Sequence, residues 1–126
     1  MIFIIVPAYN EEKKIGRVIS GLFKTGIQQM TIVVIDDGSS DNTAEVSKSA
    51  GAVVLKHEIN RGQGSALQTG NEYALERGAD FAVHFDADGQ FNPADIAKAL
   101  AVMKEKNADV VLGSRFLDNR SRIPWT

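Results

Sequence analysis

The 126-residue sequence contains no cysteine, three prolines and a single tryptophan. The absence of cysteine excludes disulfide bonds and catalysis by a thiol. No apolar stretch approaches the roughly 20 residues that a membrane-spanning helix requires, and the first residues lack the layout of a secretory signal. We therefore expect a cytoplasmic protein.

The sequence also has no large excess of positive or negative charge. The formal net charge is −2, from 14 Lys and Arg against 16 Asp and Glu. This balance gives no electrostatic reason to expect a nucleic acid as a partner. A hydrophobic content of 44% and a length near the commonest domain size predict one globular domain with its own core.

Strand-like and helix-like segments alternate along the chain. Continuous apolar runs predict strands at residues 2–6, 32–35, 52–55, 81–85 and 110–112. Helical patterns lie between them over about 10–25, 43–49, 64–77 and 92–103, with Asn10 and Asn92 as the expected caps of the first and last. This alternation predicts an α/β fold, a three-layer α/β/α sandwich with a mostly parallel, Rossmann-like sheet. Ligands of such sheets bind at the carboxyl ends of the strands.

Residues 86–90, with the sequence DADGQ, follow the fourth predicted strand. Asp86 and Asp88 place two carboxylates at i and i+2, and Gln90 adds an amide oxygen two residues later. Such hard oxygen ligands suit Mg²⁺ or Mn²⁺ held together with the phosphates of a substrate. The alternative interpretation is an acidic turn, because Asp, Gly and Asn commonly connect a strand to a helix.

Polar residues also follow the first two predicted strands. After Pro7 ends the first strand, Tyr9 could pack its ring against a nucleobase and Glu11 could accept hydrogen bonds from it; the alternative is an ordinary helix cap. After the second strand, Asp36 or Asp37 could read a base edge or ribose hydroxyls. The alternative there is an Asx-rich turn in which Asp41 or Asn42 caps the next helix.

Gly62 and Gly64 follow the third predicted strand, where they let the backbone approach a ligand next to a helix N-terminus. The usual phosphate motifs do not fit, because the third glycine of a dinucleotide fingerprint and the Gly-Lys-Ser/Thr triplet of a P-loop are missing. We expect His57 to be a loop residue near the site and His84 a satisfied sheet residue. Neither has the partner histidines that zinc requires.

Five motifs together closely resemble the family 2 glycosyltransferases: VPAYNEE at 6–12, VIDDGSSD at 34–41, NRGQGSA at 60–66, FDADGQ at 85–90 and GSRF at 113–116. Within that family the chain looks most like the dolichyl- or polyprenyl-phosphate sugar transferases. The resemblance covers essentially the whole chain. It implies a glycosyltransferase A-type fold that binds a UDP- or GDP-sugar as donor, with Mg²⁺ or Mn²⁺ as cofactor.

The resemblance also implies roles for individual residues. The nucleoside pocket would be lined by Pro7, Ala8, Tyr9 and Glu11, with Asp36 or Asp37 holding the base. The donor would be flanked by Arg61 and by the backbone of Gly62, Gln63 and Gly64, and Arg115 would contact a phosphate. The catalytic pair would be Asp86 and Asp88. The metal would be held by Asp86, Asp88 and Gln90, with Asp86 nearer the ribose and diphosphate.

In the relatives that the motifs indicate, the chain continues past the position of Trp125. We therefore expect residues 1–126 to be a nucleotide-sugar-binding glycosyltransferase domain that lacks the C-terminal acceptor-binding part. The favoured function is an inverting transferase, peripheral to a membrane, whose acceptor is a polyprenyl or dolichyl phosphate. The alternatives are a non-catalytic nucleotide-sugar-binding module completed by a partner chain and, ranked lower, a nucleotidyltransferase. An apolar edge left exposed would favour a homo-oligomer.

Overall fold

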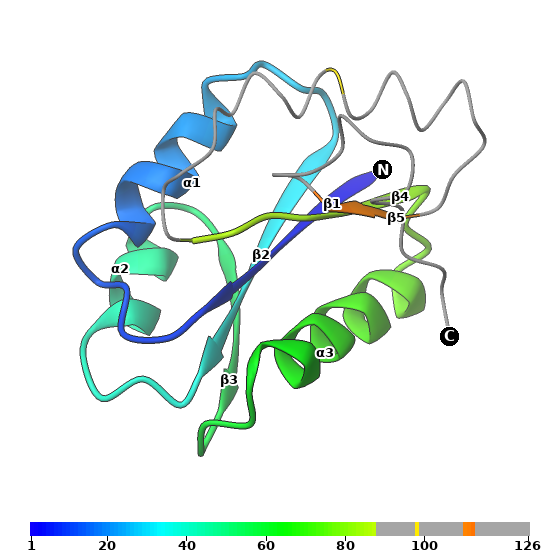
Figure 1. The fold of residues 1–126 in the computed structure, drawn as a ribbon. Helices are drawn as coiled ribbons and strands as arrows, with labels where there is room; N and C mark the ends of the chain where they lie inside the picture. The colour runs from blue at the N-terminus through cyan, green and yellow to red at the C-terminus, as the bar shows by residue number, and fades with distance from the viewer. Residues whose placement is uncertain (88–97, 99–109, 113–126) are drawn as a thin grey trace.

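The computed structural model describes residues 1–87, 98 and 110–112, which form one sheet with helices on both faces (Figure 1). The elements in chain order are β1 (Ile2–Ala8), α1 (Ile15–Phe23), β2 (Met30–Asp37), α2 (Thr43–Ser49), β3 (Val53–His57), α3 (Gln63–Glu76), β4 (Phe81–His84) and β5 (Val110–Leu112). The strand order is β3-β2-β1-β4-β5, and each neighbouring pair is parallel. The predicted α/β sandwich with a mostly parallel sheet is confirmed.

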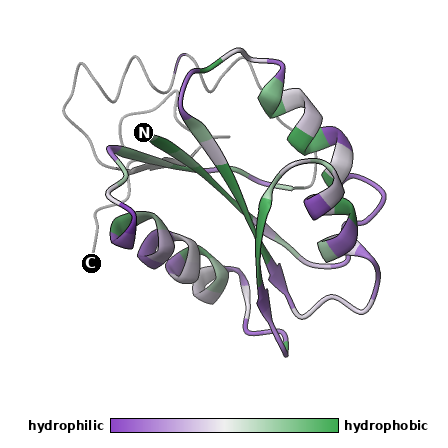
Figure 2. Cartoon of the chain, turned by 180° about the vertical axis from the view of Figure 1, so that it is seen from behind, coloured by the Kyte–Doolittle hydropathy of each residue, from purple (hydrophilic) through white to green (hydrophobic). Residues whose placement is uncertain are grey.

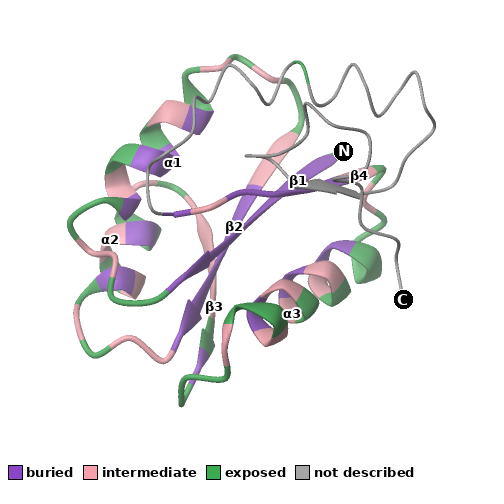
Figure 3. Ribbon diagram, viewed as in Figure 1, coloured by how far each residue is buried: buried purple, intermediate pink, exposed green. Residues whose placement is uncertain are grey.

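The helices lie in two layers, with α1 and α2 on one face of the sheet and α3 on the other (Figure 1). Successive residues of a strand point to opposite faces, so the two central strands supply two apolar clusters. The cluster under α1 and α2 includes Ile4, Val6, Ile19, Leu22 and Val34. The cluster under α3 includes Phe3, Ile5, Val33, Ile35 and Ala66. Burial on both faces explains the continuous apolar runs of β1 and β2 (Figure 3).

The strands β2 and β3 end at Asp37 and His57, each two residues later than the end predicted from its apolar run. The extra residues continue the parallel register, with Asp36 opposite Lys56 and Asp37 opposite His57. Figure 2 shows the resulting change, from hydrophobic strand centres to hydrophilic carboxyl ends. The prediction that His57 is a loop residue is wrong, since it ends β3 with 9% of its surface exposed.

The first helix begins at Ile15, so the prediction that Asn10 caps it is also wrong. Asn10 has a φ of 52°. Its Oδ1 accepts hydrogen bonds from the N–H of Ser40 at 2.9 Å and from the Ser40 hydroxyl at 3.3 Å. The side chain therefore connects two loops and does not cap a helix. The helix predicted to follow Asn92 lies outside the described residues.

The helix α3 approaches the sheet closely because of Gly70. A Cβ atom at this position would lie 2.3 Å from Cγ2 of Ile5 and 2.9 Å from Cδ1 of Ile35. Both isoleucines are fully buried in the sheet, so neither side chain can move away easily. In the part of the chain that the structure describes, no helix has the length and apolar character needed to cross a membrane.

We predict that Gly70→Ala lowers the free energy of unfolding by about 1–2 kcal/mol, because overpacking costs about 1–3 kcal/mol and the better helix propensity of alanine recovers up to about 1 kcal/mol. The matched control is Gly64→Ala in the same helix, where a Cβ would have no atom within 4 Å. Urea unfolding followed by circular dichroism measures both. Equal stabilities of the two variants would contradict the close approach of α3.

Candidate functional site

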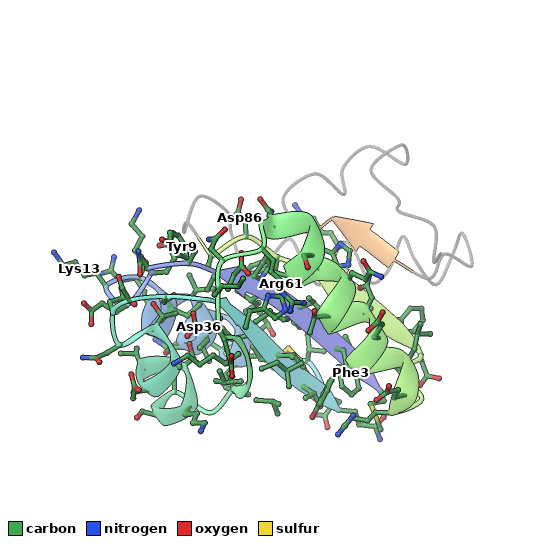
Figure 4. All side chains as sticks on the ribbon, turned by 90° about the horizontal axis from the view of Figure 1, so that it is seen from below. Phe3, Tyr9, Lys13, Asp36, Arg61 and Asp86 are labelled. Carbon is green, nitrogen blue, oxygen red and sulfur yellow. The ribbon has the colours of Figure 1, made fainter. Side chains whose placement is uncertain are left out.

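A pocket of about 200 Å³ opens at the carboxyl edge of the sheet. Figure 4 shows Tyr9, Arg61 and Asp86 toward this edge and Phe3 toward the opposite end of β1. The pocket is lined by Pro7, Ala8, Tyr9, Glu11, Asp37, Asn60, Gly62, Gln63 and Asp86. All except Asn60 were expected from the sequence, Gln63 through its backbone. The structure thus brings together groups from four separate motifs.

Three other expected residues lie beside the pocket and do not line it. Asp36 is 1% exposed, and its Oδ1 accepts a hydrogen bond at 3.0 Å from the N–H of Ser39, which is the Asx-type turn weighed as its alternative. Arg61 has an exposed side chain, and Gly64 is exposed in the first turn of α3. Of the two candidates for a base-binding carboxylate, Asp37 is the one at the pocket.

The residues Asp88, Gln90 and Arg115 lie outside the described part of the chain, and their roles stay predictions. Asp86 is half-buried in the pocket wall. Within residues 1–87, 98 and 110–112, no group of three or more His, Asp or Glu side chains could hold a metal ion. The side chains that can coordinate through oxygen at the pocket are Glu11, Asp37, Asn60, Gln63 and Asp86. Such a set of hard oxygen donors fits Mg²⁺ or Mn²⁺ better than a softer metal.

Asp37 accepts hydrogen bonds from three groups at the pocket wall. Its Oδ1 accepts hydrogen bonds from the backbone N–H of Arg61 at 2.9 Å and from Nδ1 of His57 at 2.8 Å. Its Oδ2 accepts a hydrogen bond from the N–H of Gly62 at 2.8 Å. One side chain at the end of β2 therefore fixes both the end of β3 and the loop that leads into α3.

The hydrogen bonds of Asp37 outweigh the effect of its burial. Burial alone raises the pKa of the carboxyl, but the N–H of Arg61, the ring of His57 and the N–H of Gly62 stabilise the charged form. The pKa of Asp37 is therefore held below its ordinary value. The group is a carboxylate near neutral pH and can only accept hydrogen bonds.

Hydrogen bonds from two successive backbone N–H groups join the loop after β1 to residues that follow β2. The N–H of Asn10 donates to Oγ of Ser39 at 2.8 Å, and the N–H of Glu11 donates to Oγ1 of Thr43 at 3.0 Å. Asp41 Oδ1 accepts the N–H of Thr43, the first residue of α2, at 3.0 Å, whereas Asn42, at the N-cap position, makes no side-chain capping bond. The bonds between the loops fix the backbone at Asn10 and Glu11, next to Tyr9.

Two glycines shape the loop between β3 and α3. Gly38 has a φ of +76°, and a Cβ there would lie 2.5 Å from the backbone nitrogen of Asn60. Gly62 has a φ of +96° and precedes the first turn of α3, which no side chain caps. The N-terminus of α3 therefore faces the pocket at Gly62 and Gln63, with N–H groups that favour an anion.

His84 is buried on β4, two residues before Asp86. Its Nε2 lies 2.7 Å from Oδ1 of Asn71 on α3, whereas its Nδ1 has no hydrogen-bond partner among the described residues. The prediction of a satisfied sheet residue is therefore wrong for one ring nitrogen. Burial lowers the pKa of His84 to about 4, so the ring is neutral near pH 7.

The sequence did not indicate Asn60 as a lining residue, nor the bond between His57 and Asp37. Asn60 lies two residues before Gly62, so its place in the glycine-containing motif is the signal that could have found it. The pairing of His57 with Asp37 needed the strand register, which places the two residues directly opposite each other.

We predict that Asp37→Asn lowers the free energy of unfolding by about 2 kcal/mol at about pH 7, because hydrogen bonds to a charged group contribute about 1.5–3 kcal/mol each and an amide cannot accept at both atoms. The folded pKa lies below the ordinary 3.8, so the contribution of Asp37 is present above about pH 4 and is lost as the pH falls through the folded pKa. All other carboxyl groups are the same in Asp37→Asn and in the unmodified chain, so their titration largely cancels in the stability difference. Urea unfolding at about pH 7 and about pH 3 should show the stability difference shrinking in acid; a constant difference would contradict this.

Comparisons with known proteins agree with the fold and with the motifs. The model of the glycosyl transferase family 2 matches residues 3–126. An uncharacterized protein from Methanocaldococcus jannaschii is 44% identical over 117 residues, covering 93% of this chain and 47% of that protein. The UDP-N-acetylglucosamine–dolichyl-phosphate N-acetylglucosaminyltransferase of Methanococcus voltae is 39% identical over 132 residues, covering 91% of this chain and 52% of that protein.

A solved structure has the same architecture. Glucosyl-3-phosphoglycerate synthase from Mycobacterium tuberculosis, in complex with Mn²⁺, UDP and glucosyl-3-phosphoglycerate, aligns with a TM-score of 0.68 and 25% sequence identity. The alignment covers 82% of this chain and 39% of that one. The chain spans about half the length of the curated relatives it matches. With the family model matching nearly every residue, the chain belongs to glycosyl transferase family 2.

Proposed function

We propose that this chain binds a nucleoside diphosphate sugar together with Mg²⁺ or Mn²⁺ and is the donor-binding domain of an inverting glycosyltransferase. The observation that carries the proposal is the convergence of Tyr9, Asp37 and Asp86 on one pocket at the carboxyl edge of the sheet. An aromatic ring, a fixed carboxylate and a second carboxylate next to a helix N-terminus match the base, ribose and diphosphate of such a donor.

The nucleoside end of the pocket would be formed by Tyr9 and Asp37. Tyr9 is 49% exposed, so its ring is accessible to a base. Asp37 is charged and only accepts hydrogen bonds, which suits the ring N–H of uracil or guanine. The Methanococcus voltae relative is named for a UDP-sugar, and the Mycobacterium tuberculosis structure contains UDP. These names support uridine as the first base to test, with guanosine as the second.

The diphosphate end would be formed by Asp86, Asp88 and Gln90, which we propose to hold the metal ion, with Arg115 on a phosphate and Arg61 beside the donor. A divalent ion, when bound, stabilises the negative charge that develops on the leaving nucleoside diphosphate. The N-terminus of α3 at Gly62 and Gln63 adds N–H groups that favour the same charge. The residues of this chain would therefore bind and orient the donor's leaving group.

The acceptor would attack the sugar in line with the leaving group and invert its anomeric centre. A hydroxyl acceptor would need a carboxylate base to take its proton. A lipid phosphate is already an anion and would need none, and the Methanococcus voltae relative is named for a dolichyl phosphate. We propose a polyprenyl or dolichyl phosphate as the acceptor, which would place the reaction at a membrane surface.

A second candidate is a nucleotide-sugar-binding module that acts with a partner chain, since the groups at the described pocket suit donor binding whether or not transfer follows. We propose residues 1–126 as the donor-binding domain in either case. Both candidates predict the same donor binding. They differ in sugar transfer, which a radiolabelled donor and dolichyl phosphate in detergent would detect.

We predict that the chain binds UDP or GDP, and the corresponding sugar nucleotide, in a manner that requires Mn²⁺. Asp88→Ala should abolish this binding, because one of two metal-binding carboxylates is lost. The matched control is Asp80→Ala, the same substitution at the opposite end of β4, where an exposed carboxylate contacts only the N-terminal amine among its described partners. Calorimetric titration with and without Mn²⁺ measures both. Undiminished Mn²⁺-dependent binding by Asp88→Ala would rule out the proposed metal site.

We also predict that Tyr9→Ala weakens nucleotide binding by about 1–3 kcal/mol, the size of one base–aromatic stacking contact. The control Tyr9→Phe keeps the ring and should bind within about twofold of the unmodified chain. Titration of both variants with UDP and GDP gives the comparison. A loss of equal size in Tyr9→Phe would assign the contribution to the hydroxyl and not to stacking.

A further inference from the structure

A series of hydrogen bonds joins Asp37 of β2 to the helix α3 through His57 of β3. Nδ1 of His57 lies 2.8 Å from Oδ1 of Asp37, and Nε2 lies 2.9 Å from Oγ1 of Thr69. Oγ1 of Thr69 also lies 3.1 Å from the carbonyl oxygen of Ser65, so its single hydrogen can be donated either to this carbonyl or to Nε2 of His57. The side chains of His57 and Asp37 are only 8% and 5% exposed. Three elements are thus connected directly behind the pocket wall.

This arrangement fixes the direction in which Asp37 can accept further hydrogen bonds. Because the carboxylate only accepts, Nδ1 of His57 carries a hydrogen and donates it. Oδ1 then accepts from both His57 and Arg61, whereas Oδ2 accepts from Gly62. A carboxylate oxygen has room for about two acceptor contacts, so Oδ2 keeps the greater capacity. The oxygen with that capacity belongs to a residue that lines the pocket.

Thr69 holds the imidazole ring in this orientation. A histidine side chain bonded at one nitrogen alone could rotate, but here both nitrogens have partners on different elements. Thr69 lies within α3, so the position of its Oγ1 is fixed by the helix backbone. Neither His57 nor Thr69 lines the pocket, and Asp37 is the lining residue to which His57 is bonded directly.

We infer that His57 and Thr69 are positioning residues for nucleoside recognition, because they hold Asp37 so that Oδ2 accepts a ring N–H of the donor's base. The inference rests on the proposed function, in which Asp37 contacts that base. A merely structural role would weaken every ligand contact along with stability. A positioning role affects the base and leaves the metal–diphosphate end of the site unchanged.

The test measures dissociation constants of the full chain for UDP, GDP and pyrophosphate, each with Mn²⁺, by calorimetry. His57→Leu removes both ring bonds and should weaken binding of the preferred nucleotide about tenfold, the loss expected for one hydrogen bond to a charged group. Its affinity for pyrophosphate should be unchanged. The conservative variant His57→Asn, whose amide nitrogen can donate from near the position of Nδ1, should recover most of the nucleotide affinity.

A second pair of variants keeps the test decisive if His57→Leu does not fold. Thr69→Val removes the hydroxyl that orients the ring at nearly constant volume, whereas Thr69→Ser keeps it. We expect a severalfold loss of nucleotide affinity for Thr69→Val and none for Thr69→Ser. Thermal unfolding of each variant shows whether the protein is folded.

The outcomes separate this inference from the proposed function. If the unmodified chain binds no nucleotide, the proposed function fails and the inference fails with it. If nucleotides bind equally well to the unmodified chain and to the folded His57 and Thr69 variants, only the inference is overturned. Equal losses for nucleotide and pyrophosphate would also overturn it, since they would indicate a general structural role.

Discussion

The hydrogen bonds that the carboxylate of Asp37 accepts are the interactions on which the pocket depends. This carboxylate is a buried charge at the end of a central strand, and such a charge is stable only when hydrogen bonds replace its lost hydration. The replacements come from the end of β3 and from the loop before α3. The need of one buried carboxylate for hydrogen bonds therefore holds together the end of β3 and the loop that leads into α3.

The loops after β1 and β2 are also held to each other by side-chain hydrogen bonds, several of them from uncharged groups. Side chains such as Asn10, Ser39 and Thr43 bond to the backbone of the neighbouring loop and not to their own. Each loop is thereby ordered by the next one, and the carboxyl edge behaves as a connected layer. Loops that are held by hydrogen bonds before a ligand arrives lose less conformational freedom when it binds.

The architecture could be predicted from the sequence because burial on both faces produces continuous apolar strands, and β1, β2 and β4 show this pattern clearly. The order of the motifs along the chain also indicated most of the residues at the pocket. The polar ends of β2 and β3 could not be predicted in this way, since Asp36 and His57 continue strands through hydrogen bonds that apolar patterns do not reveal. The role of Asn10 depended on a contact with Ser40, 30 positions away, which local capping rules cannot anticipate.

The central position of β1 has a consequence for how the chain folds. Its first partner, β2, begins at Met30, whereas its second partner, β4, begins at Phe81. During synthesis, the edge of β1 that pairs with β4 therefore stays unpaired until residues 81–84 have left the ribosome. Such late, non-local pairing slows folding and leaves a hydrophobic strand edge exposed to association with other chains. The topology that gathers the loops at one edge of the sheet thus leaves one edge of β1 unpaired until β4 has been synthesised.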